Sequence, residues 1–175
     1  IPQDAFVLLS FGFIRDGKNI DLLIQSLKDI SDAFLIIAGR EQSGTQKTIS
    51  YYKDLADAEG VSDRCLWFNR FIAEEEVGDY FEISDIVVLT YSGKFRSASG
   101  VLNSTILFER PVIASGGKSN LQQVVKKYHL GVWVEPDSAN AIIEGIQSFR
   151  QSPIQPNYES YIRENSWQRN AEIVL

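Results

Sequence analysis

The chain has 175 residues, which is long enough for one domain with a hydrophobic core. Its formal net charge of −6 argues against a nucleic-acid partner, because affinity for a phosphate backbone requires clustered lysine and arginine side chains. With one cysteine, Cys65, and one histidine, His129, the sequence offers no disulfide framework and no metal site built from cysteine or histidine clusters. No apolar run approaches the ~20 residues that a membrane span requires, and no signal peptide is visible.

Segments typical of buried strands alternate with segments typical of amphipathic helices along most of the chain. The expected strands cover residues 6–12, 33–39, 64–71, 85–89, 111–115 and 131–135. The expected helices cover residues 18–30, 49–60, 74–84, 99–109, 120–129 and 139–151. In the fourth of these helices, we expect one apolar face to hold Leu102, Ile106 and Leu107. This order predicts an α/β, Rossmann-like fold with about six mostly parallel strands and helices on both faces of the sheet.

Two prolines, Pro153 and Pro156, interrupt the alternation near the end of the chain. We therefore expect residues 1–152 to form the Rossmann-like domain and residues 153–175 to form a C-terminal helical tail. The chain starts at Ile1 and contains no methionine, so we expect it to be a domain cut from a longer protein, although methionines can also be absent by chance.

The first candidate binding site follows the expected strand at 85–89. The loop at 92–100 is rich in glycine and serine, and a helix opens at Ser99, Gly100 and Val101. The first amides of a helix have no intrahelical partners and lie at the positive end of its dipole. They form a candidate phosphate site at the carboxyl end of a parallel strand, where open α/β sheets bind ligands. An ordinary strand–helix loop with a serine N-cap is the alternative.

The first strand–helix junction has the same character. Gly12 permits a tight turn, Gly17 frees the loop, and Arg15 and Lys18 place two cations at the helix entrance. Arginine can bind two phosphate oxygens at once, and lysine supplies a point charge. A solvated charged loop is the alternative, but two such junctions on one parallel sheet favour phosphate binding. Neither a GxxxxGK[ST] loop nor a GxGxxG motif occurs.

The order of these segments resembles the C-terminal domain of the retaining group 1 glycosyltransferases, family 4, which have the GT-B fold. The resemblance extends over residues 6–149 and rests on five segments: LLSFGFIRDGKNIDLLIQSL, FLIIAGR, CLWFNRF, SDIVVLTYSGKFRSASGVLNSTILFERPVIAS and LGVWVEPDSANAIIEGI. Enzymes of this family have two Rossmann-like domains that face each other across a cleft. The resemblance implies that this chain is the half that binds a nucleotide-sugar donor, and that an N-terminal acceptor domain is missing from it.

The resemblance also implies roles for individual residues. The donor diphosphate would be bound by Arg15, Lys18, Ser99, Gly100 and Val101. The base and ribose would be bound by Arg70, Phe71, Ile72 and Ser104. The family's Glu-x7-Glu motif, whose glutamates contact the transferred sugar and the ribose, falls here on Arg96 and Ser104. A cation and a short hydroxyl cannot supply the same hydrogen-bond acceptors, so we expect Arg96 near the sugar but with a different role.

The first junction departs from the family as well. Gly12 is followed by Phe13, where the family has an arginine, and we expect Arg15 to act in its place. Lys18 matches the family lysine, but Asn19 replaces the glycine that usually follows it.

The chemistry implied is the transfer of a sugar from a nucleotide sugar to a glycan or glycolipid. The cations and helix amides would stabilise the departing diphosphate, so we expect no metal and no cofactor. No catalytic acid or base is evident, and we expect this chain alone to be inactive. The resemblance implies a cytoplasmic location, with peripheral membrane contact through the missing domain. A non-catalytic nucleotide- or phosphosugar-binding module is the first alternative. A flavodoxin-like regulatory domain is the second; it would require carboxylates clustered at strand ends, and Asp4, Asp16 and Asp85 do not form an obvious set.

Overall fold

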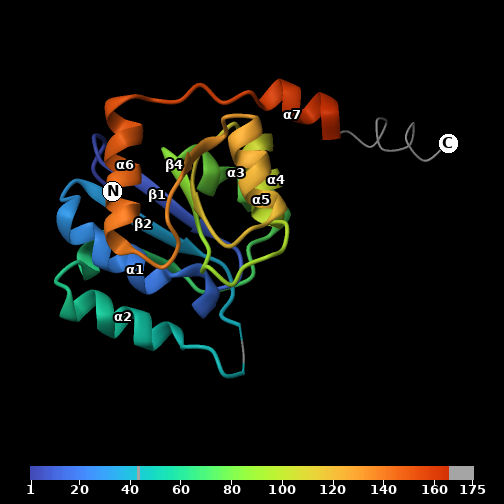
Figure 1. The fold of residues 1–175 in the computed structure, drawn as a ribbon. Helices are drawn as coiled ribbons and strands as arrows, with labels where there is room; N and C mark the ends of the chain where they lie inside the picture. Colours follow the sequence, from blue (N-terminus) through green and yellow to red (C-terminus); the bar gives the residue numbers. More distant parts are fainter. Residues whose placement is uncertain (43, 166–175) are drawn as a thin grey trace.

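The computed structural model describes residues 1–42 and 44–165 (Figure 1). Within this part of the chain, one sheet is formed by β1 (Phe6–Phe11), β2 (Ala33–Ala38), β3 (Cys65–Phe68), β4 (Ile86–Thr90), β5 (Val112–Ser115) and β6 (Gly131–Trp133). The strand order is β3-β2-β1-β4-β5-β6, and every neighbouring pair is parallel. The structure therefore confirms the predicted Rossmann-like parallel sheet.

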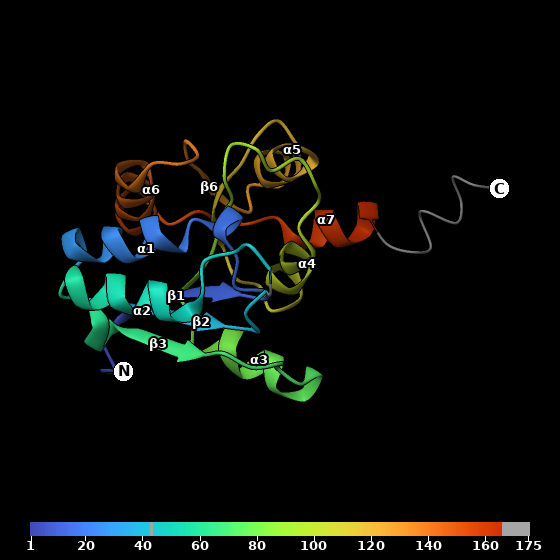
Figure 2. The same ribbon diagram turned by 90° about the horizontal axis from the view of Figure 1, so that it is seen from below.

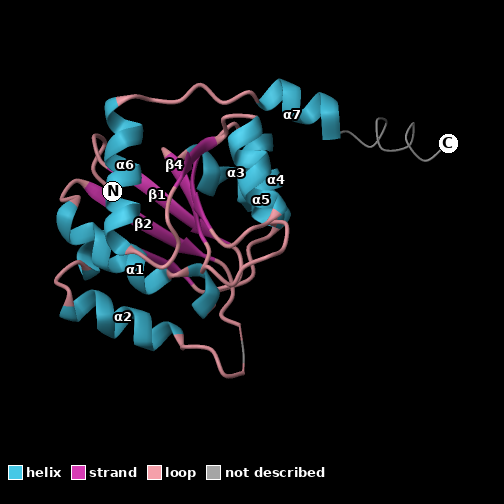
Figure 3. Ribbon diagram, in the orientation of Figure 1, coloured by secondary structure: helices cyan, strands magenta, loops and turns pink. Residues whose placement is uncertain are grey.

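Helices cover both faces of this sheet, as Figures 2 and 3 show. One layer contains α1 (Ile20–Ser26), α2 (Ile49–Ala58) and α6 (Ala139–Gln151). The other contains α3 (Glu74–Glu82), α4 (Gly100–Leu107) and α5 (Asn120–Lys127). Successive strand residues point to opposite faces, so that Leu8 packs in the first layer while Val7 and Leu9 pack in the second. Burial on both faces explains why the strands read as continuous apolar runs.

Two expectations about the helices were wrong in detail. The helix predicted over residues 18–30 begins only at Ile20, because residues Asp16–Lys18 form a 3₁₀ turn and Asn19 has a left-handed φ of 53°. On α4, Leu107 is 73% exposed, and the fully buried neighbour of Leu102 and Ile106 is Thr105. At 3.6 residues per turn, position 107 lies about 140° around the helix from position 102, so the two cannot share a buried face.

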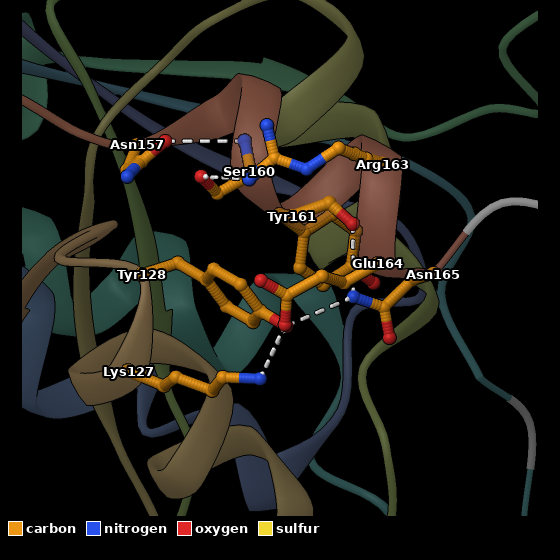
Figure 4. Close-up of polar contacts among 8 residues, drawn as sticks. All are labelled: Lys127, Tyr128, Asn157, Ser160, Tyr161, Arg163, Glu164 and Asn165. Atoms are coloured by element: carbon orange, nitrogen blue, oxygen red, sulfur yellow. Dashed lines mark hydrogen bonds and ion pairs between the residues drawn. The ribbon is translucent and has the colours of Figure 1, made fainter.

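The C-terminal segment crosses from α6 to the opposite layer and ends in α7 (Tyr158–Asn165), as Figure 1 shows. Figure 4 shows how α7 is attached. The Tyr161 ring packs edge-on against Tyr128, with centroids 5.3 Å apart, and its hydroxyl donates to Asn103 of α4. The Glu164 carboxylate accepts hydrogen bonds from Lys127 Nζ and the Tyr128 hydroxyl. A helical tail is thus present over residues 158–165, and its predicted continuation over 166–175 lies outside the described residues.

Candidate functional site

The sheet places its topological switch point between β1 and β4. From β1 the chain winds to β2 and β3 on one side, and from β4 it winds to β5 and β6 on the other. Ligands of open α/β sheets bind at the carboxyl ends of the strands beside such a point. The loops that follow β1 and β4 flank it, and these are the two junctions singled out in the sequence.

These two junctions meet in a pocket of about 350 Å³, which we call the phosphate pocket. Its lining includes all five residues expected at a diphosphate: Arg15, Lys18, Ser99, Gly100 and Val101. Gly12 allows the close approach, because a Cβ atom there would lie 3.4 Å from both Lys18 Nζ and Val101 Cγ2. The structure therefore brings together residues that are more than 80 positions apart in the sequence.

Lys18 is buried at the floor of the phosphate pocket, with 8% of its surface exposed. Its Nζ donates a hydrogen bond to the carbonyl oxygen of Phe11, and its own carbonyl accepts one from Thr90 Oγ1. Burial, together with the charge of Arg15, lowers the pKa of Lys18 to about 7. An anion bound here would favour the charged form of this lysine.

Arg15 is a half-buried cation whose hydrogen-bonding capacity is not used. Its Nε atom is buried and has no partner among the described residues. It forms no salt bridge within the described part of the chain. A buried donor without an acceptor is unfavourable, and an anion in the phosphate pocket would supply that acceptor.

At the amino end of α4, the N-cap side chain does not hydrogen-bond to the backbone amides, as it usually does in a helix. Ser99 is the N-cap residue, but its side chain makes no capping hydrogen bond. Instead, Ser99 Oγ hydrogen-bonds to the Tyr91 hydroxyl, 2.8 Å away, and burial raises the pKa of Tyr91. The alternative interpretation, a loop closed by an ordinary serine cap, is therefore wrong in its geometry. A Cβ atom at Gly100 would meet no atom within 4 Å, so the space beside the first residue of α4 is open.

A separate pocket of about 440 Å³ contains the residues expected to bind the nucleotide base: Arg70, Phe71 and Ile72. We call it the aromatic pocket. It shares Phe11, Gly12 and Phe13 with the phosphate pocket, so the two are contiguous. Phe71 and Phe13 are 77% and 55% exposed there, which is unusual for phenylalanine and provides two ring faces for a planar ligand.

Arg70 and Ser104, both expected at the base and ribose, line different pockets. The Arg70 guanidinium is engaged in its own loop by a bidentate salt bridge to Glu76, at 2.7 and 2.6 Å. This hydrogen bonding holds the pKa of Glu76 at about 2. Arg70 therefore shapes the loop that carries Phe71 and Ile72. Ser104 lines the phosphate pocket and does not line the aromatic pocket with Arg70.

Sequence reasoning missed several residues of the site. It noted Phe13 only as a replacement for an arginine, and it assigned no role to Arg40, whose guanidinium lies 6.0 Å from the centre of the Phe13 ring. It also missed Phe95, which stacks on Tyr91 with ring centroids 4.0 Å apart. An aromatic residue inside a glycine- and serine-rich loop was the available signal for Phe95.

One carboxylate joins three of the surrounding loops. Asp137, in the loop before α6, accepts a hydrogen bond from the Asn19 side chain at 2.9 Å. It also accepts one from the backbone amide of Gly93 at 2.8 Å. Asn19 adjoins Lys18, and Gly93 begins the loop before α4, so Asp137 fixes the two junctions relative to each other.

The carboxylates considered for a flavodoxin-like site do not gather at this edge. Asp85 accepts a hydrogen bond from the Val7 amide near the amino end of β4. Asp16 accepts hydrogen bonds from the Lys47 amide and the Tyr52 hydroxyl. No group of three or more potential metal ligands occurs among the residues that the structure describes. None of the described helices has the length and apolar character needed to cross a bilayer.

Comparison with known proteins identifies relatives of the whole chain. The family model of the glycosyl transferases group 1 matches residues 1–169. A comparison with curated proteins found no match.

Solved structures with the same fold include three of particular interest. Sucrose-phosphate synthase from Thermosynechococcus elongatus has a TM-score of 0.70 and 24% identity over 87% of this chain and 38% of that one. The Anabaena protein HepE, solved in complex with UDP, has a TM-score of 0.77 and 16% identity over 98% of this chain and 49% of that one. The C-terminal domain of the group 1 family protein LpcC from Francisella tularensis has a TM-score of 0.67 and 20% identity over 87% and 78% of the two chains. This chain therefore spans half or less of the first two proteins.

Proposed function

The chain belongs to the glycosyl transferases group 1 family, and we propose that it is the nucleotide-sugar-binding domain of a retaining hexosyltransferase. In this proposal a second domain binds a glycan or glycolipid acceptor and closes the cleft. The proportions of the similar structures, of which this chain spans 38% and 49%, support a longer parent protein. A cytoplasmic location stays a prediction from the resemblance.

One observation carries the proposal: two strand–helix junctions at the switch point form a single pocket, with helix amides free of a side-chain cap and two cations that have no salt bridge to any described residue. Arg15 and Lys18 supply positive charge, and the first amides of α4 supply donors, all from residues that line the same pocket. Such an arrangement suits a diphosphate.

The contiguous aromatic pocket suits the base. Phe13 and Phe71 have exposed rings there. The aromatic pocket joins the phosphate pocket at the residues they share, Phe11, Gly12 and Phe13. Stacking on an aromatic side chain is tolerant of base identity, because every base has a π-face. The proposal therefore specifies a nucleoside diphosphate and leaves the base to measurement. The UDP bound in the HepE structure makes UDP the first ligand to test.

In the proposed reaction, the glycosidic bond to the diphosphate breaks and negative charge develops on the leaving phosphate. Arg15, Lys18 and the α4 amides are preorganised to stabilise that charge. The proposal includes no metal, since these cations and amides can neutralise the diphosphate by themselves. The chemistry at the acceptor is assigned to the second domain.

The test is a calorimetric panel of UDP, GDP, ADP and TDP, each compared with its nucleoside. We expect one diphosphate to bind, and Arg15→Ala combined with Lys18→Ala to weaken it by about a hundredfold or more while the nucleoside loses little. Equal losses for diphosphate and nucleoside would refute the assignment of the phosphate pocket.

A transfer assay then separates an enzyme domain from a non-catalytic binding module. The longer parent protein should transfer sugar from the matching donor. This chain alone should bind the donor without transferring its sugar, because only one wall of the cleft is present and no acceptor is oriented. Robust transfer by the 175-residue chain would show that the division of labour proposed here is wrong. Donor binding by a parent that has no transferase activity would favour the non-catalytic module.

A further inference from the structure

A third pocket, of about 550 Å³, adjoins the phosphate pocket, and we call it the cationic pocket. The two pockets share Arg15, Phe95 and Ala98. The other side of the cationic pocket is formed by Gln42 and Gln46, which follow β2. A group bound there would lie directly beside a diphosphate that contacts Arg15. That is where the sugar of a nucleotide-sugar donor must be, since it is bonded to the diphosphate.

All the charged residues that line the cationic pocket are positive. Arg15, Lys94 and Arg96 line it, and no aspartate or glutamate is among its described lining residues. None of these three cations forms a salt bridge with any residue that the structure describes. Other cations of the described chain, such as Arg40 and Lys53, have no salt bridge either. The distinguishing feature of this pocket is that three cations and no carboxylate line it.

Among the carboxylates of the surrounding loops, Asp16, Glu41 and Asp137 are occupied, and Glu41 accepts a hydrogen bond from the Ile49 amide. Asp16 accepts hydrogen bonds from the Lys47 amide and the Tyr52 hydroxyl. Asp137 accepts hydrogen bonds from Asn19 and from the Gly93 amide. None of these three carboxylates lines the cationic pocket. The positive charge in the pocket therefore has no matching carboxylate among the described lining residues.

Arg96 is held in place by the backbone and not by an acid. Its Nη1 atom donates to the carbonyl oxygens of Gly93 and Phe95. The guanidinium lies directly against Gly117, where a Cβ atom would collide with it. The amide of Gly117 in turn donates to the Phe95 carbonyl oxygen at 3.1 Å, which joins the two loops. A fixed guanidinium with edges still unpaired is suited to an incoming planar anion.

We propose that the cationic pocket binds a carboxylate on the transferred sugar, so that the donor is a nucleoside diphosphate uronic acid. This inference rests on the proposed function, because the diphosphate positions the sugar. Arginine binds a carboxylate through two parallel charge-assisted hydrogen bonds, and Lys94 and Arg15 add attraction from the sides. Gln42, Gln46 and Ser92 supply neutral donors and acceptors for the sugar hydroxyls. A neutral hexose would leave Lys94 and Arg96 without an anionic partner, whereas Arg15 would still have the diphosphate.

The test compares two donors that differ only at the sixth carbon of the sugar. UDP-glucuronate and UDP-glucose are titrated into this chain at one salt concentration; if the panel selects guanine, GDP-mannuronate and GDP-mannose replace them. We expect the uronate to bind about tenfold more tightly or better. Affinities that agree within about twofold would overturn the inference.

Two variants separate recognition of the carboxylate from general support of the loop. Arg96→Gln should abolish the preference for the uronate while leaving the affinity for the nucleoside diphosphate unchanged. Lys53→Gln removes one positive charge from an exposed position on α2 and serves as the matched control, which should keep the preference. If Arg96→Gln weakens the nucleoside diphosphate, the hexose donor and the uronate donor equally, Arg96 only supports the loop and the inference is wrong.

The remaining outcomes are also distinguishable. Binding of methyl glucuronide to the protein saturated with UDP, without a uronate preference among donors, would assign the carboxylate to the acceptor and overturn the donor assignment. A chain that binds no nucleoside diphosphate at all would contradict the proposed function itself. A chain that binds the diphosphate but shows no uronate preference would contradict only the inference drawn here.

Discussion

The hydroxyl of Tyr91 and the hydroxyl of Ser99 lie 2.8 Å apart and hydrogen-bond to each other beneath the first turn of α4. This contact keeps the Ser99 side chain from capping the helix, so the first amides of α4 stay available. Whether Ser99 Oγ bonds to Tyr91 or to the helix amides thus decides whether the amino end of α4 can bind an anion.

Tyr91→Phe should therefore weaken diphosphate binding. Without the tyrosine hydroxyl, Ser99 can turn to the helix amides and compete with the phosphate. We expect a loss of about threefold to tenfold in diphosphate affinity, measured by calorimetry, and no change for the nucleoside. The double variant Tyr91→Phe with Ser99→Ala removes the competitor and should recover the affinity. A double variant as weak as the single one would contradict this explanation.

Lys18 should make diphosphate binding depend on pH. Its pKa is lowered to about 7 by burial and by Arg15, whereas the unfolded chain keeps this proton up to its ordinary pKa of 10.5. A bound diphosphate favours the charged form, so binding should take up a proton and affinity should fall as pH rises above about 7. Titrations in buffers of different ionisation enthalpy measure the proton uptake. Lys18→Met, tested with the same ligand, should lose it.

The same shift has the opposite effect on stability without ligand. Between pH 7 and 10.5 the unfolded chain binds more protons at this lysine than the folded chain does. The contribution of Lys18 to the free energy of unfolding should therefore increase with pH across this window. Urea denaturation of the wild type and of Lys18→Met at several pH values isolates the contribution of Lys18 to the free energy of unfolding. A difference between the two proteins that does not change with pH would show that Lys18 is not perturbed.

Gly39 should tolerate substitution less well than a glycine in open space. Its φ is +143°, and a Cβ atom there would overlap the carbonyl group of Gly12 in the loop after β1. Gly60 also has a positive φ, +70°, but a Cβ atom there meets nothing within 4 Å. Gly60→Ala should cost about 1 kcal/mol of strain, whereas Gly39→Ala should cost clearly more and also weaken ligand binding. Thermal denaturation compares the two, and equal losses would argue against close packing of these loops.

The attachment of α7 should depend on Tyr161. Its ring packs against Tyr128 and its hydroxyl donates to Asn103, so Tyr161→Ala removes the contacts with two helices at once. Amide hydrogen exchange over residues 158–165 should accelerate, while the amides of β1 stay protected. Arg163→Ala is the control, because Arg163 hydrogen-bonds only to Ser160 of its own helix among the described residues. Unchanged exchange in Tyr161→Ala would show that α7 is held by other contacts.

The sequence was informative about the sheet because both faces of the inner strands β4 and β5 are buried. Runs such as that of β4, with all five residues buried, have no polar alternation to misread. Helix starts were harder to predict, because Asn19 adopts a left-handed conformation that its residue type permits but does not require. The prediction for Leu107 was wrong about its angular position around the helix axis, although its residue type is typical of a buried face.

For the candidate site, the sequence was informative where the type and position of single residues indicate a chemistry. Arg15, Lys18 and Gly100 predict a phosphate site in this way, and in the structure they line one pocket. The engagement of Arg70 by Glu76 and of Ser99 by Tyr91 depends on pairs of residues that sequence patterns do not connect. The charge of the cationic pocket likewise appears only when residues from the loops after β1 and β4 are placed together.

The hydrogen bonds of Asp137 to Asn19 and Gly93 bear on any attempt to redesign this domain by exchanging loops. A relative that receives the β4–α4 loop of this chain will also receive the Gly93 amide, whose acceptor here is Asp137 in the loop before α6. Unless residues 19 and 137 travel with it, the grafted loop will lack its anchor. The smallest transferable module for donor specificity is therefore discontinuous, with three short pieces that must be moved as one.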